Sequence, residues 1–122
     1  MELNANGKVF NFVFGYGFLK EINEGSRVER SGIKMNMGVA SVITGLQTGD
    51  TESLIDTLKK ANKTENPRLT DQDIENLFND NDSDQVFDQV MEELKKSQFT
   101  KTATNRALVE MKKAEELQKP TK

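Results

Sequence analysis

Apolar residues recur at every second position near the start of the chain and at helical spacing further along. Asn6-Gly7 is a strong indication of a type I′ turn, because both central positions of that turn need positive φ. The turn places Leu3 opposite Phe10, and the alternation on either side of it predicts a β-hairpin over residues 2–14. In this register one face carries Leu3, Phe10, Phe12 and Phe14, and the other carries Val9, Asn11 and Val13.

The apolar period changes from two residues to 3.6 at Gly15-Tyr16-Gly17. Glycines at a strand-to-helix corner supply unusual backbone angles, so we expect the corner to turn the neighbouring phenylalanines onto one core. A dinucleotide fingerprint is disfavoured because Lys20 stands where a third glycine is needed, and a potassium filter because it requires membrane helices. The residues assigned to this structural corner are Phe10, Phe12, Phe14, Gly15, Gly17 and Phe18.

Five short helices are predicted after the hairpin. Their apolar stripes and capping residues place them at about residues 16–24, 37–48, 51–62, 71–79 and 84–97. Residues 26–36 look like a loop because they hold few apolar side chains. Gly38 and Gly45, inside the second predicted helix, weaken its intrinsic propensity and indicate close helix packing.

The expected fold class is α+β and mostly α, with residues 1–99 as one compact domain. Residues 100–122 carry six bases and three acids and have few apolar positions. We expect this basic tail to be weakly structured, either a frayed helix or disordered, because a weakly amphipathic helix is marginal on its own.

Neither cysteine nor histidine occurs in the chain. Disulfides and cysteine-ligated metal sites are thereby excluded, and the commonest general base is missing. We expect no enzymatic activity, no cofactor and no metal site. No apolar run approaches the roughly 18 residues of a membrane span, and Glu2 and Asn4 stand where a signal peptide would be basic. A cytoplasmic protein that does not contact the membrane is therefore expected.

The net charge of −3 divides into two blocks. Residues 71–93 hold nine acids and no lysine or arginine, whereas the tail is basic. An acidic folded part makes nucleic acid a poor partner, and the opposed blocks would permit self-association between copies.

Asp80, Asp82 and Asp84 have the spacing of the first ligands of a calcium loop. Gln85 and Met91, however, occupy the positions at which such a loop needs its glycine and its bidentate glutamate. We interpret the acids as a solvated loop with the N-terminal charges of a helix, or as an electrostatic face for a partner.

The predicted helices at 71–79 and 84–97 carry apolar stripes on short, acidic elements. Such stripes are usually buried in the protein's own core. The alternative is that they form a surface that a partner protein covers. The candidate partner-binding residues are Ile74, Leu77, Phe78, Phe87, Val90, Met91 and Leu94.

The order of segments in the first 97 residues is distinctive. A hairpin closed by Asn6-Gly7-Lys8 leads into "FVFGYGFLKEI", and "TGLQTGDTESLIDTLKKANKTENPRLT" follows after a gap. "DQDIENLFND" and "VFDQVMEELKKS" complete the series. In this order the chain resembles the tail assembly chaperones of long-tailed phages and prophages of Gram-positive bacteria.

The resemblance implies a non-enzymatic protein that binds the tape measure protein and helps recruit tail tube subunits around it. It also implies a protein of the host bacterium's cytoplasm that is absent from the mature virion, and a C-terminally extended form made by ribosomal frameshifting. The residues themselves leave two alternatives, an acidic adaptor or inhibitor of a host protein and, with less support, a small enzyme or calcium module. Salt separates the chaperone from the adaptor, because an electrostatic interface weakens steeply with ionic strength.

Overall fold

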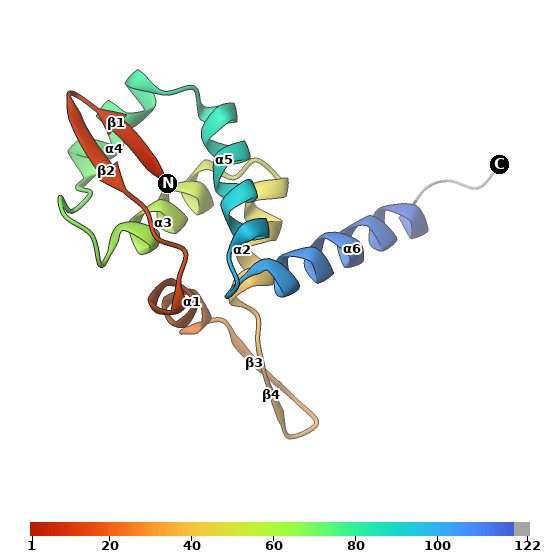
Figure 1. Ribbon diagram of the computed structural model, residues 1–122. Coiled ribbons are helices and arrows are strands. Elements are labelled where there is room, and N and C mark those ends of the chain that lie inside the picture. The colour runs from red at the N-terminus through yellow and green to blue at the C-terminus, as the bar shows by residue number, and fades with distance from the viewer. Residues whose placement is uncertain (119–122) are drawn as a thin grey trace.

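The computed structural model describes residues 1–118, which form two small β-hairpins and six helices (Figure 1). The expected α+β, mostly α class is confirmed, and α1 to α5 each begin and end within one residue of the predicted helices. The elements in chain order are β1 (Glu2–Ala5), β2 (Lys8–Asn11), α1 (Tyr16–Asn23), β3 (Arg27–Arg30), β4 (Ile33–Asn36), α2 (Gly38–Gln47), α3 (Thr51–Asn62), α4 (Asp71–Asp80), α5 (Ser83–Lys96) and α6 (Lys101–Gln118).

The first hairpin has the predicted register and the predicted turn. Leu3 pairs with Phe10, and φ is 52° at Asn6 and 78° at Gly7. The predicted faces are also confirmed, since one set of side chains is buried and Val9 and Val13 are about half exposed. The buried set is Leu3, Phe10, Phe12 and Phe14.

The second strand is shorter than the predicted strand that ended at Phe14. β2 ends at Asn11, because β1 is only four residues long and offers no partner beyond Met1. The chain then leaves the two-stranded ladder. Phe12 still donates its backbone N–H to the Met1 carbonyl over 2.8 Å, and Val13 donates to the carbonyl of Ala61, at the end of α3, over 2.8 Å.

The core lies between the first hairpin and the helices. In Figure 1 the hairpin lies against α4, while α2, α3 and α5 complete the body. Side chains from all these elements are almost fully buried and together exclude water from one continuous apolar cluster. The largest of them are Phe10, Phe12, Ile43, Leu54, Leu58, Leu77, Val86, Val90 and Leu94.

The two glycines of α2 lie at close contacts, as predicted. A Cβ added to Gly38 would lie 2.4 Å from the carbonyl oxygen of Ile22, and one added to Gly45 would lie 2.5 Å from Oγ of Ser53. Gly38 also donates its backbone N–H to Oδ1 of Asn23 over 3.0 Å. The absence of a side chain therefore sets how closely α2 approaches α1 and α3.

Residues 26–36 do not form the predicted loop. They contain a second antiparallel hairpin in which Val28 pairs with Met35, and the turn at Ser31-Gly32 has positive φ at both residues. Every residue of β3 and β4 is exposed, and the hairpin projects from the body in Figure 1. The segment looked like a loop because it has few apolar residues, and a hairpin without a buried face leaves only a weak pattern.

The basic tail is a helix over the described residues. Thr104 is buried, and Ala107, Leu108 and Met111 are half-buried against the core, so the first half of α6 packs on the body. The hydroxyls of Thr100 and Thr104 both donate to the carbonyl of Leu94 and tie α6 to the end of α5. The expectation for the tail also covered residues 119–122, which lie outside the described residues.

Candidate partner-binding surface

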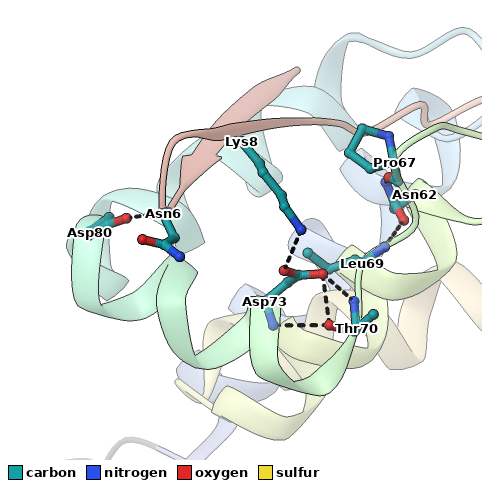
Figure 2. Close-up of polar contacts among 8 residues, drawn as sticks. All are labelled: Asn6, Lys8, Asn62, Pro67, Leu69, Thr70, Asp73 and Asp80. Carbon is teal, nitrogen blue, oxygen red and sulfur yellow. Dashed lines mark hydrogen bonds and ion pairs between the residues drawn. The ribbon is translucent and has the colours of Figure 1, made fainter.

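α4 begins at a reciprocal capping box. The hydroxyl of Thr70 accepts the backbone N–H of Asp73 over 3.2 Å, and Oδ2 of Asp73 accepts the backbone N–H of Thr70 over 3.0 Å (Figure 2). The backbone hydrogen bond from Thr70, followed by that from its hydroxyl, holds the pKa of the Asp73 carboxyl below its ordinary value of 3.8. This carboxylate is therefore a structural cap that stabilises the first turn of α4.

Three polar contacts attach the first hairpin to α4 and to Asn81, the residue that caps its C-terminal end. Lys8 Nζ lies 4.0 Å from Oδ1 of Asp73, and the backbone N–H of Asn6 donates to Oδ2 of Asp80 over 2.7 Å (Figure 2). The side-chain amide of Asn81 donates to the carbonyl of Asn4 over 2.8 Å. Two of the nine acids in residues 71–93 therefore hold the hairpin in place.

The acids between α4 and α5 also have local roles. Oδ2 of Asp82 accepts the backbone N–H of Gln85 over 3.2 Å and caps α5, while Asp84 lies in the first turn of that helix. This confirms the interpretation of these two acids as helix N-terminal charges. Within residues 1–118, no group of three or more histidine, cysteine, aspartate or glutamate side chains could hold a metal ion.

The seven candidate partner-binding residues divide into two groups. Four of them belong to the buried core, with exposed fractions of 8% or less, and these are Ile74, Leu77, Val90 and Leu94. Phe78, Phe87 and Met91 are only partly buried. Phe87 and Met91 are four residues apart on α5 and so share one of its faces. A partner can reach these three side chains without opening the core.

The predicted corner brings its aromatic side chains together. The rings of Phe14 and Phe18 meet edge to face with their centroids 5.0 Å apart, and both side chains are buried. The prediction that Gly15 and Gly17 supply unusual backbone angles is wrong. Gly15 has a φ of −101°, and Gly17 lies within α1. An added Cβ would make only ordinary contacts at either position, at 3.6 Å and 3.9 Å, so neither glycine is needed for the turn.

Sequence reasoning missed a second apolar surface. A groove of about 730 Å³ lies between α1, β4, α2 and α6, with Leu19, Met35, Val39 and Phe99 among its lining residues. Phe99 is 50% exposed. Other exposed apolar side chains lie on the same two projecting elements, the second hairpin and α6, and these are Val28, Ile33, Val109 and Leu117. The signal in the sequence was weak: Val28 before the turn at Ser31-Gly32, and Ile33 and Met35, two residues apart, after it.

Charged side chains on or next to α1, α3 and α4 form ordinary ion pairs with one another. Lys59 pairs with Asp71, and this hydrogen-bonded lysine lowers the pKa of the Asp71 carboxyl. Lys63 Nζ lies 2.7 Å from Oε1 of Glu21 and links α3 to α1. Within residues 1–118, none of the helices combines the length and the hydrophobicity that crossing a bilayer requires.

Comparison with known proteins identifies a family. The sequence model of the family described as "Phage tail assembly chaperone protein, TAC" matches residues 2–108. That range contains both hairpins, α1 to α5 and the first part of α6. No curated protein and no solved structure gives a significant match.

Proposed function

The chain belongs to the phage tail assembly chaperone family, and we propose that it binds the tape measure protein while the tail is built. A chaperone of this kind has a non-enzymatic role and acts on tail proteins in the host cell. The tape measure protein as the specific partner is supported by the ordered resemblance of the first 97 residues.

The observation that carries the proposal is the set of partly buried side chains Phe78, Phe87 and Met91. They lie on α4 and α5, and the buried members of the same stripes hold those two helices against the core. We infer that a partner's apolar helix packs across these three side chains. An amphipathic helix that binds in this way places its apolar side chains, three or four residues apart, against the apolar surface of the other protein.

The acids around these side chains suit a chaperone. Residues 71–93 carry nine acids and no base, so the surface keeps a high charge density while it covers apolar segments of another protein. Charge of one sign promotes solubility of the complex. Methionine adapts to several partner shapes because its side chain is unbranched and flexible.

The wider role follows from the family. We propose that the protein helps recruit tail tube subunits around the tape measure protein, in the cytoplasm of the host bacterium, and that it is absent from the mature virion. A protein that covers apolar helices only until the tube encloses them has no place in the finished particle.

Co-expression with the tape measure protein of the same phage tests the proposal. The wild-type chain is expected to raise the soluble fraction of that protein several-fold, and the double substitution Phe87→Ala with Met91→Ala is expected to abolish most of the gain. Because the contact is apolar, a complex isolated by pull-down should survive high salt, whereas an acidic adaptor would lose its partner.

A matched control separates the surface from general helix damage. Asp88→Ala with Gln89→Ala changes two exposed residues of the same helix and should leave the gain intact. Circular dichroism checks that both double variants keep the helical content of the wild type. Failure of the wild-type chain to change the solubility of the tape measure protein would overturn the proposal.

A further inference from the structure

The second hairpin has one apolar face and one polar face. Residues that pair across antiparallel strands, and residues two apart along a strand, have their side chains on the same face. Val28 pairs with Met35 and Arg30 pairs with Ile33, so these four side chains share one face. Its three apolar side chains are 41% to 64% exposed, and a two-stranded hairpin without a covered face is marginal in water. The opposite face carries only polar and charged residues, Arg27, Glu29, Lys34 and Asn36.

The apolar face of the hairpin continues into the groove between α1, β4, α2 and α6. Met35 belongs to both, because it also lines the groove together with Leu19 and Phe99. α2 and α6 contribute small side chains to the groove, so the side chains of a further helix can insert between them. These small residues are Ala40, Ala103 and Ala107. We call the four hairpin side chains and the groove together the hairpin–groove surface.

The groove is rich in methionine. Three of the five methionines of the chain line it, namely Met35, Met37 and Met111. Methionine side chains are unbranched and adapt their shape, and they are over-represented on surfaces that bind apolar segments of varied sequence. Together with the small alanines, they favour an apolar helix as the occupant of the groove.

The charges on the hairpin–groove surface favour an acidic occupant. Within residues 1–118, neither Arg30 nor Arg106 takes part in an ion pair. Glu110 also lines the groove, but its carboxylate already lies 3.6 Å from Nζ of Lys113. A guanidinium forms its strongest contact as a two-pronged pair with a carboxylate. The helix that fits this surface therefore has aspartate or glutamate beside its apolar side chains.

We propose that the hairpin–groove surface binds an amphipathic helix of another protein whose apolar stripe is flanked by acidic residues. The apolar side chains of that helix enter the groove and cover the hairpin, and its carboxylates pair with Arg30 and Arg106. The proposal goes beyond the proposed function, because none of the groove's lining residues lies on α4 or α5. The acids in residues 71–93 repel such a helix, so the two surfaces select segments of opposite charge.

NMR of the methionine methyl groups tests the proposal on the full chain. The probe is a synthetic peptide of about 18 residues, about 27 Å long as a helix, with leucines at helical spacing flanked by glutamates. It should shift the signals of Met35, Met37 and Met111 and leave that of Met91, on α5, in place. A peptide with lysine in place of each glutamate, and an acidic peptide with two central prolines that break the helix, should leave the three groove signals in place.

Two charge removals test the role of the arginines. Arg30→Gln with Arg106→Gln should weaken binding of the acidic peptide several-fold, because two opposite-charge contacts are lost. Lys34→Gln with Lys112→Gln is the matched control. It removes the same net charge from the polar face of the hairpin and from a residue of α6 that does not line the groove, and it should leave the affinity nearly unchanged.

Two apolar truncations test the role of the hairpin. Ile33→Ala with Met35→Ala should weaken binding of the acidic peptide about tenfold or more, because both side chains lose apolar area that the peptide covers. Val9→Ala with Val13→Ala shortens two half-exposed side chains next to the other hairpin's turn and end, and it should leave the affinity unchanged. Circular dichroism checks that every double variant keeps the helical content of the wild type.

The outcome is separable from that of the proposed function. Phe87→Ala with Met91→Ala should leave binding of the acidic peptide unchanged, and Ile33→Ala with Met35→Ala should leave the solubility of the tape measure protein unchanged. Several results would refute the hairpin–groove surface as a site for an acidic helix. These are groove signals that the acidic peptide does not shift, groove signals that the lysine or proline peptide shifts equally, and groove signals that shift with protein concentration alone, which would identify a second copy as the occupant.

Discussion

The side-chain oxygen of Asn62 accepts the backbone N–H of Leu69 over 2.6 Å at the junction between α3 and α4 (Figure 2). The amide nitrogen of the same side chain donates to the carbonyls of Asn11 and Pro67, over 3.0 Å and 3.1 Å. Asn62 is completely buried, so one side chain satisfies backbone groups of the first hairpin, the loop and the approach to α4.

We predict that Asn62→Leu destabilises the fold strongly, although leucine keeps the branched shape of the side chain. Each buried backbone group left without a partner costs about 1–3 kcal/mol. Urea denaturation followed by circular dichroism measures the loss in the free energy of unfolding. Asn79→Leu, at an exposed position of α4, is the control and should change that free energy little. Equal effects of the two substitutions would mean that the Asn62 contacts do not stabilise the junction.

Phe12→Ala is expected to lower the free energy of unfolding by about 3–5 kcal/mol, because it leaves a cavity in the core. Phe12 is only 2% exposed and continues the buried face of the first hairpin. Chemical denaturation measures the loss, and Val13→Ala, on the half-exposed face, should cost much less. If Phe12→Ala folds with wild-type stability and loses only partner binding, the stretch is a binding site and not a structural anchor.

Gly38→Ala and Gly17→Ala should have opposite effects on stability. The methyl group at residue 38 would lie 2.4 Å from the carbonyl oxygen of Ile22, so α2 must move, at a cost of about 1–3 kcal/mol. The methyl group at residue 17 meets only Thr64, at 3.9 Å, and alanine favours the helix by up to about 1 kcal/mol. Thermal and urea unfolding measure the change in the free energy of unfolding for each variant. A Gly38→Ala variant more stable than the wild type would contradict the close approach of α2 to Ile22.

The cap of α4 predicts a dependence of stability on pH. The folded pKa of Asp73 lies below the ordinary value of 3.8, so its carboxylate stabilises the fold above pH 3.8. That contribution is lost as the pH falls through the lower, folded value. The difference in unfolding free energy between wild type and Asp73→Asn should therefore be largest near neutral pH and shrink in acid. Urea denaturation over a pH series measures the difference. Growth of the difference on acidification would be inconsistent with a lowered pKa.

Much of the local structure could be predicted because it depends on neighbours in the sequence. The turn at Asn6-Gly7 needs positive φ at two consecutive residues, and the period of the apolar positions distinguishes strand from helix. The close packing of α2 was also visible, because glycines inside a helix are costly unless something approaches closely. At the corner, Phe14 and Phe18 are buried against each other. The expected unusual angles of the glycines are absent, since a β-to-helix transition also occurs at ordinary backbone angles.

The candidate surface could be predicted only in outline. The stripes of α4 and α5 identified seven apolar residues, and the helical period does not distinguish Leu77, which is completely buried, from Phe78 beside it. The second hairpin gave a weak pattern because no element covers it. The role of Asn62 was invisible, since its partners at Asn11 and Leu69 come from separate parts of the chain.

The sequence by itself determined the first hairpin with its register, the helices α1 to α5 and, through the order of its segments, the family. Those properties rest on turn chemistry, apolar period and capping, which act over a few residues. The tertiary structure decided which face of each helix is covered, how Asn62 joins three segments, and that a groove stays open between α1, β4, α2 and α6. Burial depends on which distant segments meet, and a local pattern shows that a face is apolar without showing what lies against it.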